Sequence, residues 1–178
     1  MKNLITLVIA LVAPALATAA EDRANLNDAE IAAIVVAANQ IDIDAGKLAE
    51  SKSTNPEVKA FAHRMITDHT DVNKQATDLA TKLKLTPEES TLSRAMKSDA
   101  KRNMDRMKKL SGKAFDKLYL NDESSFHNAV IDTVDSKLLP SAENVDLKSL
   151  LVKVRPALVS HREHADKLLS IVHEMNYK

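Results

Sequence analysis

Apolar residues recur through most of this chain at alternating steps of three and four positions, a spacing that places them on one face of an α-helix. The two most regular series predict helices over residues 55–84 and 143–174. Weaker series of the same kind predict helices over residues 28–52, 88–110 and 113–138. Glycine, which β-rich folds need in tight turns, occurs only twice. The pattern therefore predicts an all-α protein.

The starts of the first three predicted helices carry residues that favour helix termini. Asn27 with Glu30 three positions later matches a capping box, and Asn55 is a capping residue followed by proline. The run Thr-Pro-Glu-Glu at residues 86–89 predicts that the third helix begins near residue 88. The short connection between the first two helices favours an antiparallel hairpin, whereas the highly charged third helix is expected outside the bundle. We therefore predict a four-helix bundle with an additional crossover helix.

The first residues have the features of a secretory leader. Lys2 precedes an apolar run at residues 4–13, and small residues at positions 17 and 19 fit a cleavage site. We predict a signal peptide over residues 1–19 and a single helical-bundle domain over residues 20–178. Because no later segment approaches the roughly 20 apolar residues of a membrane helix, the mature protein is expected to be periplasmic or secreted, with no transmembrane segment.

Charge and cysteine content narrow the classes of function that the sequence allows. Lysine plus arginine and aspartate plus glutamate each number 25, and such a balanced surface argues against a nucleic-acid partner. No cysteine occurs, so any metal ion must be held by nitrogen, oxygen or thioether donors. Neither a Ser–His–Asp arrangement nor a glycine-rich phosphate loop is indicated, which favours a binding protein over an enzyme. Nothing in the pattern specifies a protein partner.

Three of the apolar helical faces are each interrupted by one polar residue, at Asp42, His69 and His161. With a rise of about 1.5 Å per residue, counting from the helix ends places these residues and His127 at nearly the same height in the bundle. Inward-pointing imidazoles and a carboxylate can converge on one ion. Glu123, one turn before His127, is a further candidate ligand or an acceptor that orients an imidazole. We therefore predict that these five residues form a site for one divalent transition metal ion: zinc, copper, manganese or iron.

Two other interpretations of this polar layer stay open. The protein is a structural or stress-related interaction module if the buried aspartate and histidines form a hydrogen-bonded network without metal, since buried polar groups normally find partners. It is a pH-responsive bundle if protonation of the clustered histidines near about pH 5–6 opposes their burial and loosens the core. Loss of a bound ion when a histidine is replaced distinguishes the metal site from both.

Several stretches of the chain resemble the bacterial domain-of-unknown-function 4142 family, and the resemblance covers nearly all of the chain after the leader. The matching stretches are DIDAGKLA at residues 42–49, NPEVKAFA at residues 55–62 and MITDHT at residues 65–70, with Phe115, Asp116, Tyr119, His127 and His161 later in the chain. The resemblance implies an exported, ferritin-like helical bundle of the kind described as a predicted outer-membrane protein. Association with the outer membrane is therefore a further expectation.

The same resemblance supports the aspartate and the histidines of the predicted site, although family members often carry glutamate at the position of Asp42. Di-iron sites of the ferritin type need a glutamate three positions before a histidine on each of two helices. Here Ile66 and Leu158 occupy those positions. Iron storage and di-iron oxidase chemistry are therefore not expected.

Overall fold

The computed structural model describes residues 26–174, so the predicted signal peptide lies outside the described residues. Every regular element in that range is helical, which confirms the predicted all-α class. None of the described helices is long and apolar enough to cross a membrane. The elements are α1 (Asp28–Lys52), α2 (Pro56–Lys82), α3 (Thr91–Lys108), α4 (Gly112–Thr133), the π-helical turn η1 (Val134–Leu138), α5 (Leu139–Ser141) and α6 (Val145–Glu174).

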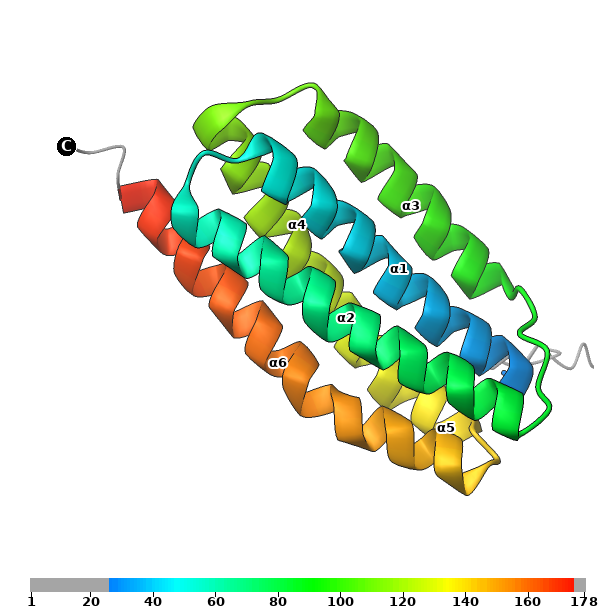
Figure 1. The fold of residues 1–178 in the computed structure, drawn as a ribbon. Helices are drawn as coiled ribbons and strands as arrows, with labels where there is room; N and C mark the ends of the chain where they lie inside the picture. The colour runs from blue at the N-terminus through cyan, green and yellow to red at the C-terminus, as the bar shows by residue number, and fades with distance from the viewer. Residues whose placement is uncertain (1–25, 175–178) are drawn as a thin grey trace, which may run out of the picture.

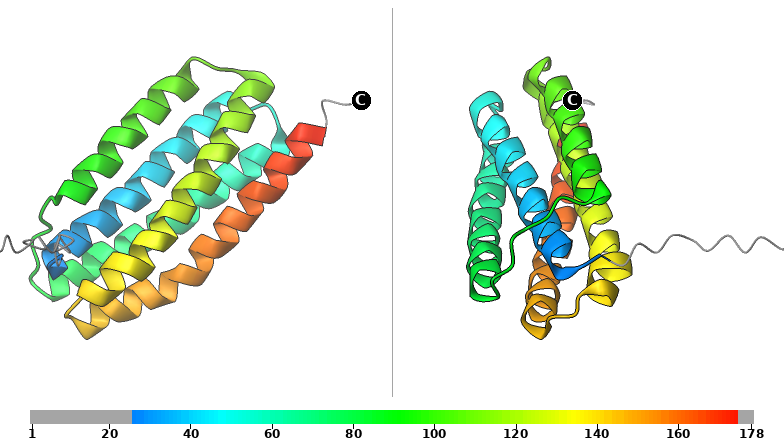
Figure 2. Two further views of the ribbon diagram at one scale, coloured as in Figure 1. Left: turned by 180° about the vertical axis from the view of Figure 1, so that it is seen from behind. Right: turned by 90° about the vertical axis from the view of Figure 1, so that its right-hand side faces the viewer.

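Four long helices, α1, α2, α4 and α6, run side by side, and α3 lies on the outside (Figure 1). The hairpin of α1 and α2 forms one layer of the bundle, and α4 with α6 forms the other (Figure 2). The crossover helix α3 packs along α1 and, less extensively, along α4. This arrangement is the predicted four-helix bundle with an additional crossover helix.

Asparagine side chains cap the starts of three helices. Asn27 and Glu30 form the predicted capping box of α1. The Asn55 side chain accepts from the first N–H groups of α2, as its position before Pro56 predicts. The Asn144 side chain does the same for the last helix, which therefore begins at residue 145 rather than at the predicted 143.

The third helix begins later than predicted, at Thr91 instead of residue 88, and ends at Lys108. The Ser90 hydroxyl accepts from the N–H of Ser93, and the Ser93 hydroxyl accepts from the N–H of Ser90. This reciprocal pair is a capping box in which serine replaces glutamate. The Thr-Pro-Glu-Glu run at residues 86–89 therefore precedes the helix, because a second cap close by satisfies the first N–H groups.

The fourth helix also differs from its predicted extent. It ends at Thr133 and continues through the wider turn η1 into α5, which includes Pro140. The N–H of Leu139 bonds to the carbonyl oxygen of Val134, five positions earlier. In a regular α-helix a proline ring crowds the carbonyl group four positions earlier, and here the wider turn directly precedes the proline. The helical path thus continues through Pro140, beyond the predicted end at residue 138.

The core consists of two apolar clusters separated by a polar layer. Ile31 and Leu151 belong to the cluster near α5, and Phe61 and Leu168 to the cluster at the opposite end. In each of the four bundle helices, buried polar residues lie between the segments that contribute to the two clusters. The buried polar residues of this layer are Asn39, Asp42, His69, Glu123, His127 and His161.

The α1–α2 hairpin is closely packed at Gly46. A methyl group added there would lie 2.9 Å from Cγ1 of Ile66 and 3.0 Å from the backbone oxygen of Ala62. The second contact is with backbone, which cannot move without shifting α2. Gly46 therefore sets the separation of α1 and α2 one turn from Asp42.

We expect Gly46→Ala to lower the free energy of unfolding. The overlap should cost about 1–3 kcal/mol, which exceeds the gain of about 1 kcal/mol from replacing a helical glycine. Urea denaturation measures the change. Gly112→Ala is a useful comparison because Gly112 has a φ of +55° but no neighbour within 4 Å of the added atom, so it reports backbone strain alone. A Gly46→Ala protein as stable as the parent would show that the hairpin can separate freely at this point.

Candidate metal centre

The structure brings all five predicted site residues together in the polar layer. Asp42 comes from α1, His69 from α2, Glu123 and His127 from α4, and His161 from α6, and each is at most 3% exposed. One nitrogen from each histidine lies within 4.8 Å of the others, and Asp42, Glu123 and His127 form a second group with the same property. Because His127 belongs to both groups, the five residues form one continuous cluster.

Hydrogen bonds determine which ring nitrogen of two histidines carries a proton. Nδ1 of His69 lies 2.8 Å from Oδ1 of Asn39, whose amide nitrogen in turn donates to the carbonyl oxygen of Val35. Asn39 therefore presents an acceptor, and Nδ1 of His69 must be the donor. Nδ1 of His127 lies 2.9 Å from the carbonyl oxygen of Glu123, which is also an acceptor. Both histidines thus carry the proton on Nδ1 and a lone pair on Nε2.

His161 has the opposite arrangement of its ring nitrogens. Nε2 lies 2.8 Å from Oδ2 of Asp68, a carboxylate that Arg64 holds at 3.2 Å. The proton is therefore on Nε2, and Nδ1 is buried without a hydrogen-bond partner. Each of the three histidines accordingly uses one nitrogen to donate to an oxygen and keeps a lone pair on the other. Metal-binding histidines commonly have this arrangement, in which the second nitrogen fixes the ring orientation.

The distances between the facing atoms match those expected around a metal ion. Nε2 of His69 lies 3.3 Å from Nε2 of His127 and 3.4 Å from Oδ2 of Asp42. Ligands at about 2.0–2.2 Å from a tetrahedral ion are about 3.3–3.6 Å apart. The two Nε2 atoms carry no proton between them, so they cannot form a hydrogen bond with each other. An ion or an additional proton is needed to make this contact favourable.

Burial keeps the histidines neutral. Desolvation, together with the neighbouring imidazoles, lowers the pKa of His69 to about 2. Desolvation lowers the pKa of His127 to about 4, with a smaller contribution from His161, and it also lowers the pKa of His161. Neutral imidazole is the form that binds metals. The site therefore presents three neutral nitrogen donors at neutral pH.

Burial shifts the pKa values of the two carboxyl groups in the opposite direction, upwards. Desolvation raises the pKa of Glu123 to about 8 and raises the pKa of Asp42, which is also raised by the neighbouring Glu123. Desolvation and the two carboxyl groups raise the pKa of Tyr119. Oε2 of Glu123 and the hydroxyl of Tyr119 are buried without hydrogen-bond partners. In this environment the carboxyl groups retain protons unless a cation replaces them.

Sequence reasoning missed the residues that orient the imidazoles. Asn39 follows the apolar run at residues 31–38 and lies one turn before Asp42, so a polar residue at helical spacing from Asp42 was a usable signal. Asp68 directly precedes His69, but it bonds to His161 of another helix, and no sequence spacing indicates that pairing. The hydroxyl of Tyr119 lies near the carboxyl groups of Glu123 and Asp42 because α4 packs against α1, and no sequence pattern indicates that position.

Fold and site together define a helical bundle with a buried cluster of groups that commonly bind metal ions. The chain belongs to the DUF4142 family, a domain of unknown function, whose model matches residues 13–168. No curated protein matches the chain. Among solved structures it is similar to CopM in the Cu(II)-bound form, with a TM-score of 0.64, 15% identity, and coverage of 82% of this chain and 97% of that chain. At this identity the similarity establishes a shared bundle fold, and the ferritin-like relationship stays a prediction.

Glu123→Gln should change how stability depends on pH in metal-free protein. The folded protein holds the Glu123 proton up to about pH 8, whereas an unfolded chain releases it near the ordinary value of 4.5. The parent therefore loses stability as pH rises between these values, by up to about 1.4 kcal/mol per pH unit. The Glu123→Gln variant does not, because glutamine has no proton to release in this range. We expect the stability of the variant relative to the parent to increase from pH 5 to pH 8.

Urea denaturation in EDTA at several pH values measures this difference. Glu163→Gln, at an exposed position of α6, controls for the loss of one surface charge. A difference between Glu123→Gln and the parent that is independent of pH would contradict the raised pKa.

Proposed function

We propose that this protein binds one transition metal ion in its polar layer, with His69, His127 and His161 as nitrogen ligands. Asp42 supplies the fourth ligand, and Glu123 acts beside it as a further ligand or as a partner of its carboxyl group. The observation that supports this proposal most directly is that each histidine directs one nitrogen without a proton into the cluster while its other nitrogen donates to an oxygen. The function is metal binding, without a reaction assigned to the ion.

A metal-free hydrogen-bonded network accounts for this arrangement less well. A network that serves only to fix helix register should pair its buried nitrogens and oxygens, because unpaired buried groups are costly. Here Nε2 of His69 faces Nε2 of His127, and Nδ1 of His161 and Oε2 of Glu123 have no partner. These atoms are all electron-pair donors. A cation satisfies them together, and its charge also stabilises the ionised carboxylate of Asp42.

The donor set favours copper or zinc over magnesium or calcium. Imidazole suits copper, zinc, iron and nickel, whereas magnesium and calcium prefer oxygen ligands. The similar bundle of CopM is in a Cu(II)-bound form, which makes copper the first ion to test. Zinc, manganese and iron complete the series. Copper should bind most tightly of these four, following the general order of affinities for nitrogen and oxygen ligands.

We further propose that the protein acts outside the cytoplasm, in the periplasm or after secretion, with association with the outer membrane as an extension of that proposal. Its support is the predicted signal peptide at residues 1–19 and the family resemblance. Cell fractionation of the full chain, with determination of the mature N-terminus, tests both the compartment and the cleavage site.

Replacing a histidine of the site should abolish metal binding. Protein stripped with EDTA and titrated with Cu(II) or Zn(II) is expected to bind one ion per chain, measured by calorimetry and elemental analysis. His69→Ala, His127→Ala and His161→Ala each remove one ligand and should weaken binding at least about tenfold. His63→Ala is the matched control, because His63 lies on α2 with a 72% exposed side chain.

Circular dichroism establishes that each variant remains folded. Parent protein that binds none of the four ions, or variants that bind as tightly as His63→Ala, would contradict the proposed site. The first of these outcomes would favour the hydrogen-bonded network.

Asn39→Ala tests the orientation of His69 without removing a ligand. Asn39 accepts from Nδ1 of His69, so its loss frees the ring to rotate or to move its proton to Nε2. We expect metal affinity to fall by about 10–100-fold with one ion still bound at saturation. An unchanged dissociation constant in a folded Asn39→Ala protein would show that this hydrogen bond does not position the ligand.

A further inference from the structure

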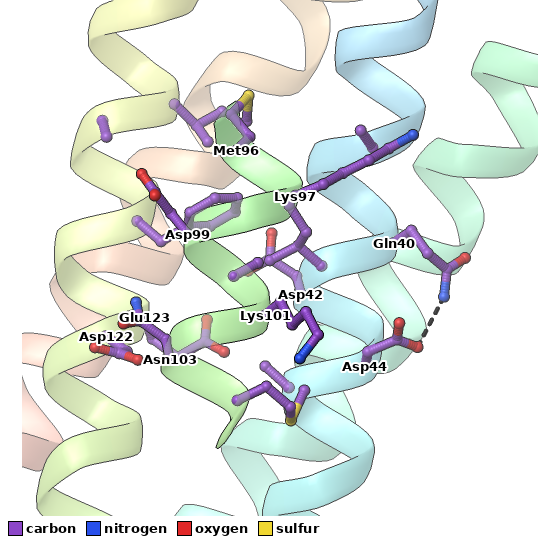
Figure 3. A pocket seen from close by; sticks show the side chains of 18 of the residues that line it. Gln40, Asp42, Asp44, Met96, Lys97, Asp99, Lys101, Asn103, Asp122 and Glu123 are labelled. Atoms are coloured by element: carbon purple, nitrogen blue, oxygen red, sulfur yellow. Dashed lines mark hydrogen bonds between the residues drawn. The ribbon is translucent and has the colours of Figure 1, made fainter. Parts of the chain in front are cut away.

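A cavity of about 510 Å³ lies between α3 and the bundle, next to the metal centre. Residues from α1, α3 and α4 line it, and most of its exposed lining is apolar. Figure 3 shows α3 passing over the hollow, with Asp42 on α1 and Glu123 on α4 behind it. The apolar side chains that line it include those of Ile41, Leu92, Met96, Met104, Phe126 and Val130.

The packing of α3 explains why this space is not filled. The two buried residues of α3 are Ser93 and Met107, which lie near its two ends. Between them Ala100 faces the cavity, and Ala37 and Ala129 line the opposite walls. Alanine side chains leave the centre of the interface empty, so α3 is held at its ends over an apolar hollow.

One end of the cavity carries acceptor atoms that lack partners. Tyr119, Asp122 and Glu123 all line the cavity, and each has a buried side-chain oxygen without a hydrogen bond. Glu123 is 3% exposed and Tyr119 is fully buried. Once ionised, the carboxyl oxygens of Asp122 and Glu123 only accept hydrogen bonds. A positively charged donor favours that ionised form and binds it most strongly.

The lysines that line the cavity do not supply that donor. Lys97 forms an ion pair with Glu89, and Lys101 lies 2.9 Å from Asp105 on the same helix. Glu89 is exposed before the start of α3, and Asp105 is a half-buried residue of α3 itself. The two lysines therefore leave these carboxyl oxygens, which are shielded from solvent, without a charged donor.

We propose that this cavity binds a small organic cation: a molecule with an apolar body and a protonated amine. The amine donates to the carboxyl groups of Glu123 and Asp122, and the body occupies the apolar space beneath Ala100. A metal ion alone fits the cavity less well, since an ion needs neither its volume nor its apolar walls. The proposal does not require the metal centre to be occupied, although the two sites share Glu123.

The first test uses n-octylamine with protein held metal-free by EDTA, measured by calorimetry. We expect one saturable site per chain. Octan-1-ol has the same apolar body without a charge and should bind at least about tenfold more weakly, and octanoate, with the opposite charge, should bind more weakly still. The proposal is overturned if octanoate binds as well as the amine, or if n-octylamine shows no saturable binding.

Ala100→Leu is the decisive variant, because leucine narrows the hollow and changes none of the metal ligands. It should weaken n-octylamine binding at least about tenfold, the loss of about two buried methylene contacts, and leave the binding of Cu(II) or Zn(II) unchanged. Ala60→Leu, at an exposed position of α2, is the matched control and should behave like the parent in both measurements. Glu123→Gln should weaken amine binding about tenfold or more while keeping the size of the cavity.

The two proposals fail in different ways. If the parent protein binds n-octylamine but none of the metal ions, only the proposed metal centre is overturned. Amine binding that is unchanged in Ala100→Leu overturns the cavity as its location, whatever the metal content of the protein.

Discussion

The burial of a polar layer halfway along the bundle is the constraint on which the rest of this structure depends. Three imidazoles and two carboxyl groups lie where water cannot solvate them, so each requires partners within the protein or a bound cation. Asn39 on α1 orients His69 on α2, and Asp68 on α2 holds His161 on α6. A shift of one helix by a single turn, about 5.4 Å, would break these pairs. The layer therefore determines the register of the helices as well as the chemistry between them.

The same burial shifts the pKa values of the two kinds of titratable group in opposite directions. It lowers the pKa of the histidines, so that their lone pairs are available, and it raises the pKa of the carboxyl groups, so that they hold protons. A divalent ion bound as proposed would resolve both effects, since it would bind the lone pairs and replace the proton of Asp42. Metal binding and folding are therefore expected to be coupled, and the metal-free protein should be the less stable form.

The carboxyl groups and the imidazoles of the layer border different cavities. Asp42 and Glu123 line the cavity beneath α3. His69 and His161 line a second cavity of about 60 Å³, to which Asp42 also belongs. An organic cation bound beneath α3, as proposed, would therefore meet the carboxyl groups before the imidazoles.

The sequence by itself determined the helical class, the topology and the identity of five of the six polar residues in the buried layer. Each follows from local periodicity: an apolar face repeats every three to four residues, and Asp42, His69 and His161 interrupt it. The Ser90 cap and the π turn before Pro140 were not predicted, because several capping sites and turn types suit the same residues. The bond from Asp68 to His161, the facing Nε2 atoms and the hollow beneath Ala100 depend on how separate helices are placed together. Only the tertiary structure decided these features, because contacts between residues 30 to 93 positions apart leave no periodic signal in the sequence.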